Sequence, residues 1–170
     1  MSKIYTKTGD RGMTGTFLGR MAKSDKLAQG LGAVDELNSW IGLCRSQYSV
    51  FNIRYSVIDS ELKKIQNNLL ILGSQLAGSK KKLRYEETKR LEKLIDKLTK
   101  DLPKLANFIY PKGYLQVARS VCRRAEREVV AAEIKDKNVL KYLNRLSDAL
   151  FTMARWVNFK RGGMEEVWKR

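Results

Sequence analysis

The sequence contains no histidine, which excludes every mechanism that needs an imidazole base or an imidazole metal ligand. It has two cysteines, Cys44 and Cys122, in apolar helical contexts without CxxC spacing, so we expect small core residues instead of a disulfide or a metal pair. Only two prolines interrupt the 170 residues, which leaves room for long helices. No apolar run reaches transmembrane length and the first residues turn polar at once, so we expect a cytoplasmic protein without membrane contact.

The positive charge is in large excess, formally +16, and this predicts an anionic partner or a solubilising surface. Much of the charge is spread over what read as outer helix faces, such as Lys63–Lys64 and Lys80–Lys82. The sequence lacks aromatic residues interleaved with basic ones, and it lacks helix-turn-helix and zinc-finger patterns. We therefore expect no nucleic-acid partner, and a basic helical nucleic-acid-binding module is kept only as an alternative.

Apolar residues recur at three- and four-residue intervals along most of the chain, which is the spacing of amphipathic helices. This periodicity predicts helices at about 24–47, 58–76, 91–102, 114–135 and 137–161. Ser24 is the expected N-cap of the first helix. Since no segment shows sustained strand alternation, we predict an all-α bundle of about five helices in a single domain, 1–170. Its parts are an N-terminal loop at 1–23, the helical bundle at 24–161 and a loosely ordered tail at 162–170.

One predicted helix combines a high charge with the pattern of a buried segment. At helical spacing Arg119, Arg123 and either Glu126 or Arg127 fall on one face. The stripe expected to pack inward consists of Val117, Val121, Cys122, Ala125, Val129 and Ala132. Guanidinium groups present planar forks of donors to carboxylate or phosphate oxygens. The segment therefore predicts a polyanion site or a buried ion-pair network, with a solvated basic face as the ordinary alternative.

The N-terminal loop is rich in glycine and threonine. Gly9, Gly12 and Gly15 recur at three-residue spacing beside Lys7, and threonines stand at 6, 8, 14 and 16. Glycines allow backbone N–H groups to approach a ligand and threonine hydroxyls add donors, which together favour an anion cradle. The order of a Walker A loop is absent. A flexible N-terminal arm is the alternative.

Two further places have both an ordinary and a functional interpretation. Asp35 is either a surface carboxylate or the partner of one of the arginines. Asn144 and Asp148 lie one turn apart in the last predicted helix, and they form either a polar stripe or an edge that contacts a ligand.

Five blocks of the sequence occur in the order of a known family. They are Tyr5 to Gly12, Val34 to Asn38, Ile65 to Leu69, Arg119 to Arg127 and Tyr142 to Asp148. They closely resemble the PduO-type ATP:cob(I)alamin adenosyltransferases, and the resemblance extends from Lys3 to about Asn158. It implies a five-helix bundle that assembles as a homotrimer, with ATP and the corrinoid bound at the interfaces between neighbouring subunits.

The resemblance also implies roles for individual residues. The family's nucleotide-wrapping loop maps to Thr6, Lys7, Thr8, Gly9, Thr14 and Gly15, with Lys23 as a further phosphate contact. Its arginine-rich motif maps to Arg123, Arg124, Ala125, Glu126 and Arg127, and its helix-five asparagine to Asn144. Asp35 and Arg119 correspond to the residues that bridge subunits. The expected catalytic set is Arg119, Arg123, Asp35 and Phe108.

The implied reaction needs no protein nucleophile. The cobalt of cob(I)alamin attacks the 5′-carbon of ATP and expels triphosphate, while the protein orients the substrates and stabilises the developing charge. Mg²⁺ is expected to be held mainly through the ATP phosphates, without protein metal ligands. In the family, a phenylalanine of a Phe-x-x-Pro-Gly-Gly segment crowds the lower face of the corrin and favours four-coordinate cobalt(II), and Phe108 is the match.

The sequence departs from the family pattern at several positions. Lys112 replaces the first glycine of that segment, the stretch between Gly113 and Arg119 is shortened, and Gln116 stands where histidine is common. Gly15 stands where serine is frequent, and one residue is missing before Lys23. The implied partners are a cobalamin reductase and a B12-dependent enzyme. A corrinoid carrier or escort of the same family is the remaining alternative.

Overall fold

The computed structural model describes residues 3–49 and 56–168. Within these ranges the chain forms five α-helices and one two-stranded antiparallel sheet. The elements are β1 (Met13–Thr16), β2 (Gly19–Ala22), α1 (Lys26–Ser49), α2 (Ser56–Leu76), α3 (Tyr85–Thr99), α4 (Tyr114–Ala131) and α5 (Lys137–Lys160). The predicted five-helix bundle is confirmed. None of the described helices has both the length and the apolar character needed to cross a bilayer.

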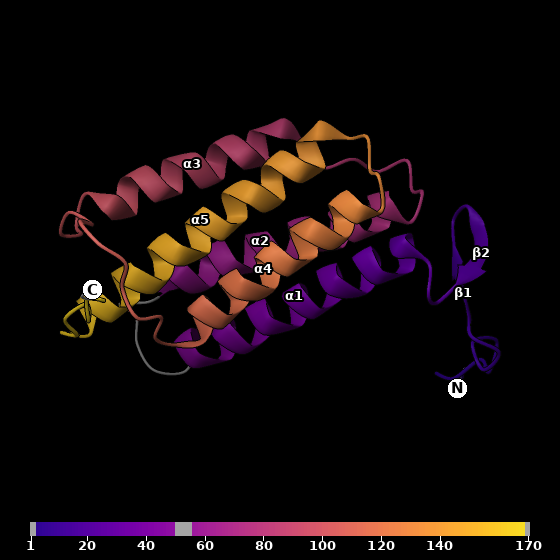
Figure 1. Ribbon diagram of the computed structural model, residues 1–170, viewed down its shortest axis with the longest axis horizontal. Helices are drawn as coiled ribbons and strands as arrows, with labels where there is room; N and C mark the ends of the chain where they lie inside the picture. The colour runs from indigo at the N-terminus through magenta and orange to yellow at the C-terminus, as the bar shows by residue number, and fades with distance from the viewer. Residues whose placement is uncertain (1–2, 50–55, 169–170) are drawn as a thin grey trace.

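The helices form an elongated bundle in which α1 packs against α2 and α4, and α5 packs against α3 and α4 (Figure 1). The strict four-and-three spacing in α2 produces this packing, because Ile58, Leu62, Ile65 and Leu72 are completely buried. The two cysteines are free and buried in the same core, as expected. Burial raises the pKa of Cys44 to about 12, so this thiol stays protonated and inert at neutral pH.

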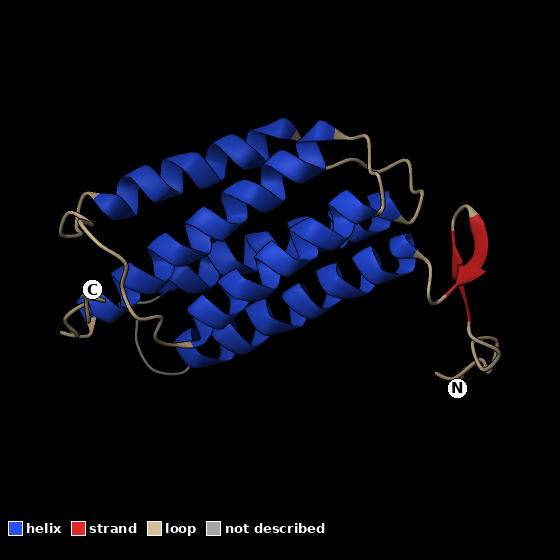
Figure 2. Cartoon of the chain, viewed as in Figure 1, coloured by secondary structure: helices blue, strands red, loops and turns tan. Residues whose placement is uncertain are grey.

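The prediction that the N-terminal residues form only a loop is wrong, because β1 and β2 pair as a hairpin with Met13 opposite Ala22. The hairpin projects beyond the first turn of α1, at the end of the bundle (Figure 2). It is attached to the end of α2, where the Phe17 N–H donates to the Ala77 carbonyl at 3.0 Å. The Leu18 side chain lies directly over Gly78, which has a positive φ of 96°.

Helix ends differ from the predicted ones for local reasons. Asp25, and not Ser24, precedes the first residue of α1, and its backbone carbonyl accepts from the Gln29 N–H at 3.0 Å. The Asp25 carboxylate accepts from the Ala22 N–H at 3.1 Å, which fixes the turn out of the hairpin. Helix α4 ends at Ala131, before the predicted residue 135, because Glu133 adopts a left-handed φ of 55°.

The tail after α5 was expected to be loosely ordered, and its described part is not. Ile109 and Val167 form an antiparallel bridge between the tail and the connector from α3 to α4. The Tyr110 N–H donates to the Glu166 carbonyl at 2.9 Å, and the Trp168 N–H donates to the Phe108 carbonyl at 2.8 Å. These bonds lie at the end of the bundle opposite the hairpin (Figure 1).

Candidate functional site

Three arginines of α4, Arg119, Arg123 and Arg127, follow one another at four-residue spacing and share a face of the helix. Arg119 Nε donates to Gln116 Oε1 at 2.6 Å, and Arg127 Nη1 donates to the backbone oxygen of Arg123 at 3.1 Å. Among the described residues, none of the three arginines forms an ion pair with a carboxylate. Burial and the neighbouring charge of Arg123 lower the pKa of Arg119. Within the residues that the structure describes, this arginine row therefore has no ion-paired carboxylate.

The other members of the arginine motif face different surroundings. Arg124 forms an ion pair with Glu36 of α1, which joins the two helices. Ala125 is completely buried in the core. Glu126 accepts a hydrogen bond from Asn144 Nδ2 at 3.2 Å. Val117, which we expected to pack inward, is 39% exposed because it lies at the edge of the apolar stripe.

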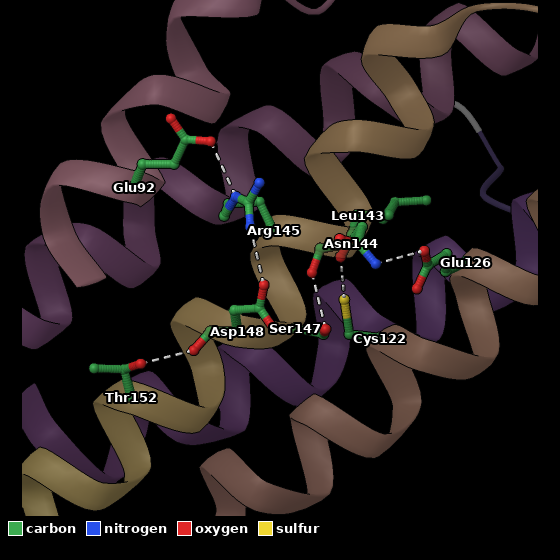
Figure 3. A network of polar contacts seen from close by, with 9 residues as sticks. All are labelled: Glu92, Cys122, Glu126, Leu143, Asn144, Arg145, Ser147, Asp148 and Thr152. Carbon is green, nitrogen blue, oxygen red and sulfur yellow. Dashed lines mark hydrogen bonds and ion pairs between the residues drawn. The ribbon is translucent and has the colours of Figure 1, made fainter. Parts of the chain in front are cut away.

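The edge of α5 that faces α3 and α4 carries Asn144, Arg145 and Asp148 (Figure 3). Arg145 Nε pairs with Glu92 Oε1 of α3 at 3.1 Å, and Arg145 Nη1 pairs with Asp148 Oδ2 at 3.3 Å. The amide of Asn144 points away from this pair, toward Glu126. Asp148 is thus engaged in an ion pair, and Asn144 is the residue of this edge that lies next to the arginine motif.

The segment before β1 folds into tight turns. Lys7 has a left-handed φ of 57°, and the Asp10 N–H donates to its carbonyl at 3.4 Å. The Gly12 N–H donates to the Gly9 carbonyl at 3.2 Å. The amine of Lys23 lies over Gly9, where an added Cβ would be only 3.2 Å from Nζ, so a larger residue would crowd the amine.

The threonines of this segment complete a compact polar loop. The Thr6 and Thr8 hydroxyls are hydrogen-bonded to each other at 2.9 Å. Arg20 of β2 donates to the Thr8 carbonyl, so the hairpin braces the loop. Thr14 and Gly15 lie in the adjoining strand β1. The structure therefore gathers the residues predicted to wrap a nucleotide into one loop-and-hairpin unit.

This unit and the arginine row are apart in the folded chain. The hairpin lies beyond the end of the bundle (Figure 1), whereas Arg119 to Arg127 occupy the middle of α4. In the described part of the chain, the hydrogen bonds of residues 3–23 reach the bundle at Ala77, directly after α2, and none reaches α4. A single chain thus holds the two halves of the predicted site without joining them.

Asp35 lies on the exposed side of α1, in a shallow groove between α1 and α2. The groove is also lined by Leu31, Val34, Asn38, Leu69, Leu70, Gly73 and Ser74. Leu70 in this groove is 63% exposed. Within the described residues the Asp35 carboxylate has no ion-pair partner. Asp35 and Arg119 therefore do not meet in one chain.

Phe108 lies in the connector between α3 and α4, at the end of the bundle opposite the hairpin. Its side chain is 79% exposed. Its ring contacts the Trp168 ring edge to face, with centroids 6.4 Å apart and an interplanar angle of 67°. No three His, Cys, Asp or Glu side chains among the described residues are close enough together to hold a metal ion.

The family profile described as Cobalamin adenosyltransferase matches residues 4–157. The chain belongs to this family. It is 41% identical over 187 residues to the corrinoid adenosyltransferase MMAB of Bos taurus, covering 99% of this chain and 76% of the relative. It is 41% identical over 172 residues to the corrinoid adenosyltransferase of Bacillus subtilis, covering 94% of this chain and 89% of the relative.

A solved structure supports the same family placement. It is a variant of the PduO-type ATP:corrinoid adenosyltransferase from Lactobacillus reuteri, complexed with cobalamin and ATP. The two folds superimpose with a TM-score of 0.91 at 34% identity, over 99% of this chain and 100% of the other. The resemblance carried by the five sequence blocks is confirmed.

Two features of the candidate site were missed in the sequence. The first is Arg20, which lies in the hairpin. The sequence signal for this hairpin is two short segments on either side of a turn that Gly19 follows, and Gly19 has a φ of 119°. The second is Arg155, which is 6% exposed. Its signal is an arginine among the apolar residues of α5, a position that requires a buried partner.

Proposed function

We propose that this chain transfers the 5′-deoxyadenosyl group of ATP to cob(I)alamin, which yields adenosylcobalamin and triphosphate. The observation that carries the proposal is the arginine row of α4, whose charges have no carboxylate partner among the described residues. Triphosphate is the anion that suits such a row, since arginine presents paired donors to phosphate oxygens. Relatives that are 41% identical to this chain carry the name corrinoid adenosyltransferase, which supports the same activity.

The reaction requires little acid–base chemistry from the protein. The cobalt electron pair forms the bond to the 5′-carbon, the bond from that carbon to its oxygen breaks, and the electron pair of the broken bond leaves with triphosphate. Negative charge builds up on the leaving group, and Arg123 and Arg127 stabilise it electrostatically. No imidazole is needed, which agrees with a chain that has no histidine.

The nucleotide site is formed by two subunits of a homotrimer. The loop-and-hairpin unit projects from one end of the bundle and makes no hydrogen bond to α4 among the described residues. A neighbouring subunit places its own α4 against this unit, so that Lys7 and Lys23 of one chain and Arg123 of the next surround the phosphates. Asp35 in its groove and Arg119 supply opposite charges for the contact between subunits.

The corrin ring lies against Phe108. An exposed aromatic ring offers a flat apolar face that excludes a ligand from the lower side of a corrin, and this favours four-coordinate cobalt(II). Mg²⁺ is bound mainly through the ATP phosphates. The partners we propose are a one-electron reductase that reduces cobalt(II) and a B12-dependent enzyme that uses the product.

An anaerobic assay with chemically reduced cobalamin tests the proposal. Incubation of the protein with ATP and Mg²⁺ should give adenosylcobalamin, seen in its absorption spectrum, together with one equivalent of triphosphate. The absence of both products would contradict the proposed function. Tight binding of adenosylcobalamin with slow turnover would instead indicate a carrier of the same family.

A further inference from the structure

We infer that Arg155 is a positioning residue for Phe108, and that it acts by holding the tail 163–168 against the connector 103–112. The inference rests on the proposed role of Phe108 at the corrin. The tail forms a clasp, defined here as residues 163–168 together with Arg155. This clasp fixes the backbone on both sides of Phe108.

The clasp is centred on a buried guanidinium. Arg155 of α5 is 6% exposed, and its Nε and Nη2 contact Glu165 Oε1 and Oε2 at 2.5 and 3.0 Å. The same Nη2 donates to the Pro103 carbonyl at 2.8 Å. One side chain therefore joins α5, the tail and the start of the connector. A buried charge keeps this geometry because losing one partner leaves the other uncompensated.

The backbone pairing extends from this ion pair to the residues that flank Phe108. The Phe108 carbonyl accepts from the Trp168 N–H at 2.8 Å, and the Tyr110 N–H donates to the Glu166 carbonyl at 2.9 Å. Lys112, which stands at a glycine position of the family motif, pairs with Glu166 Oε2 at 3.0 Å. The lysine in this chain therefore contributes a bond between the connector and the tail.

The clasp fixes the backbone of Phe108 and leaves its ring open. The ring is 79% exposed, and its described aromatic contact is the edge-to-face one with Trp168. A chain terminus that served stability alone would gain more by burying this ring. A residue that presses against a flat ligand needs an exposed ring and a fixed backbone. The backbone must be fixed because a positional error of about 1 Å can reduce a rate by about 100-fold.

The Glu165→Gln variant tests this clasp, with cobalt supplied in two oxidation states. In the first arm, cob(II)alamin, ATP and a reduced flavin are mixed, so that the flavin must donate one electron to cobalt before transfer. In the second arm, cob(I)alamin is prepared chemically and no reduction on the protein is needed. We expect the variant to lose about 10- to 100-fold of the rate in the first arm and to keep the rate of the second.

A spectroscopic readout reports on Phe108 directly. Cob(II)alamin bound with ATP should show the absorption and magnetic-resonance signature of four-coordinate cobalt with the unchanged protein, and mainly the five-coordinate signature with Glu165→Gln. A purely structural role would not change this ratio in the fraction of protein that remains folded. ATP-induced thermal stabilisation should be retained, because in the described part of the chain Glu165 makes no hydrogen bond to residues 3–23 or to the arginine row.

Two further variants complete the design. Asp101→Asn is the matched control, because it also replaces a carboxylate that pairs with a cation of α5, Lys160 at 3.0 Å, without touching the tail. We expect it to behave like the unchanged protein in both arms. Lys112→Gln removes an exposed ion pair of the clasp and leaves no buried charge, so it should fold even if Glu165→Gln does not. We expect it to lose about two- to fivefold of the first-arm rate.

The outcomes separate the inference from the proposed function. Equal losses in the two arms, or no change in the four-coordinate signal in Glu165→Gln and Lys112→Gln, would overturn the positioning role of the clasp while the transferase activity stands. No product from cob(I)alamin with the unchanged protein would overturn the proposed function and, with it, this inference.

Discussion

Gly78 and Gly162 end α2 and α5 in the same way, but only Gly78 also supports the hairpin. Both are in the left-handed region, with φ of 96° and 77°. The same pair of helix-end hydrogen bonds occurs at each: Gly78 to Gln75 and Ser79 to Ser74, and Gly162 to Phe159 and Gly163 to Asn158. Alanine in this conformation costs about 1–2 kcal/mol. Gly78→Ala and Gly162→Ala should therefore each lower the melting temperature by about 2–8 °C.

The two variants should differ in ATP binding. A Cβ at Gly78 would overlap Leu18 Cγ, whereas a Cβ at Gly162 would meet nothing within 4 Å. Leu18 is 74% exposed, so the hairpin can move away with little loss of buried area. That movement breaks the hydrogen bond from Phe17 to Ala77, which is worth about 1 kcal/mol. We expect the ATP dissociation constant of Gly78→Ala to rise about fivefold.

Calorimetric titration with ATP, together with thermal unfolding of the same samples, measures both effects. Gly162→Ala should show the loss of stability with an unchanged ATP dissociation constant. The turnover number of Gly78→Ala at saturating ATP should equal that of the unchanged protein, because saturation offsets the weaker binding and the arginines of α4 that stabilise the leaving group are unchanged. Equal ATP binding by the two variants would refute the claim that Leu18 and Gly78 seat the nucleotide loop.

Three further predictions concern other parts of the chain. Arg123→Ala should lower the turnover number about 100- to 1,000-fold, and normal turnover would contradict the proposed role of Arg123. Its melting temperature should be unchanged, since the exposed Arg123 side chain has no ion pair among the described residues. Asp35→Asn should weaken the trimer by about 3–5 kcal/mol and give smaller species in light scattering at low concentration, with unchanged helical circular dichroism. Burial alone raises the pKa of Glu87, but hydrogen bonds from Asn68 and Arg90 lower it overall from 4.5. This carboxylate therefore contributes stability above about pH 4.5, and the contribution is lost as the pH falls through its lowered pKa. In denaturant titrations, the unfolding free energy of Glu87→Gln should decrease less between about pH 5 and 3 than that of the unchanged protein.

The helical part of the fold was predictable because its stabilisation is local in sequence. In α2 the residues at four-and-three spacing are the ones that the bundle buries, and Gly78 ends the helix where the spacing predicts it. A pattern of this kind repeats over five turns and survives individual exceptions. Val117 is such an exception, since its place at the edge of a stripe depends on the rotation of α4 against its neighbours.

The hairpin and the tail were not predictable by the same means. Each strand of the hairpin has four residues, and β2 has only two that are partly buried, which is too short for an alternation to be recognised. The tail is ordered by pairing between Ile109 and Val167, residues that are distant in the sequence. Periodicity records which face of a segment is buried, but it contains no information about which distant segment will pair with it.

The chemistry of the candidate site was predictable, but the partners of its charges were not. Arg123 and Arg124 are neighbours with the same side chain, yet Arg124 pairs with Glu36 and Arg123 has no carboxylate partner among the described residues. Likewise Glu36 faces α4, while its neighbour Asp35 lies in the groove beside α2. One residue along a helix turns a side chain by about 100°, so the pairing depends on how the helices are rotated in the bundle.

The placement of the three proposed functional regions links ligand binding to assembly. The loop-and-hairpin unit lies at one end of the bundle, Phe108 lies at the other end, and the arginine row runs between them on α4. In the proposed closed ring of three chains, each chain would give its loop to one site and its α4 to another. The like charges of the arginine row repel one another at four-residue spacing, and bound triphosphate offsets this repulsion. We therefore expect ATP to bind most tightly to the assembled form and, by mass action, to stabilise the proposed trimer as well as each subunit.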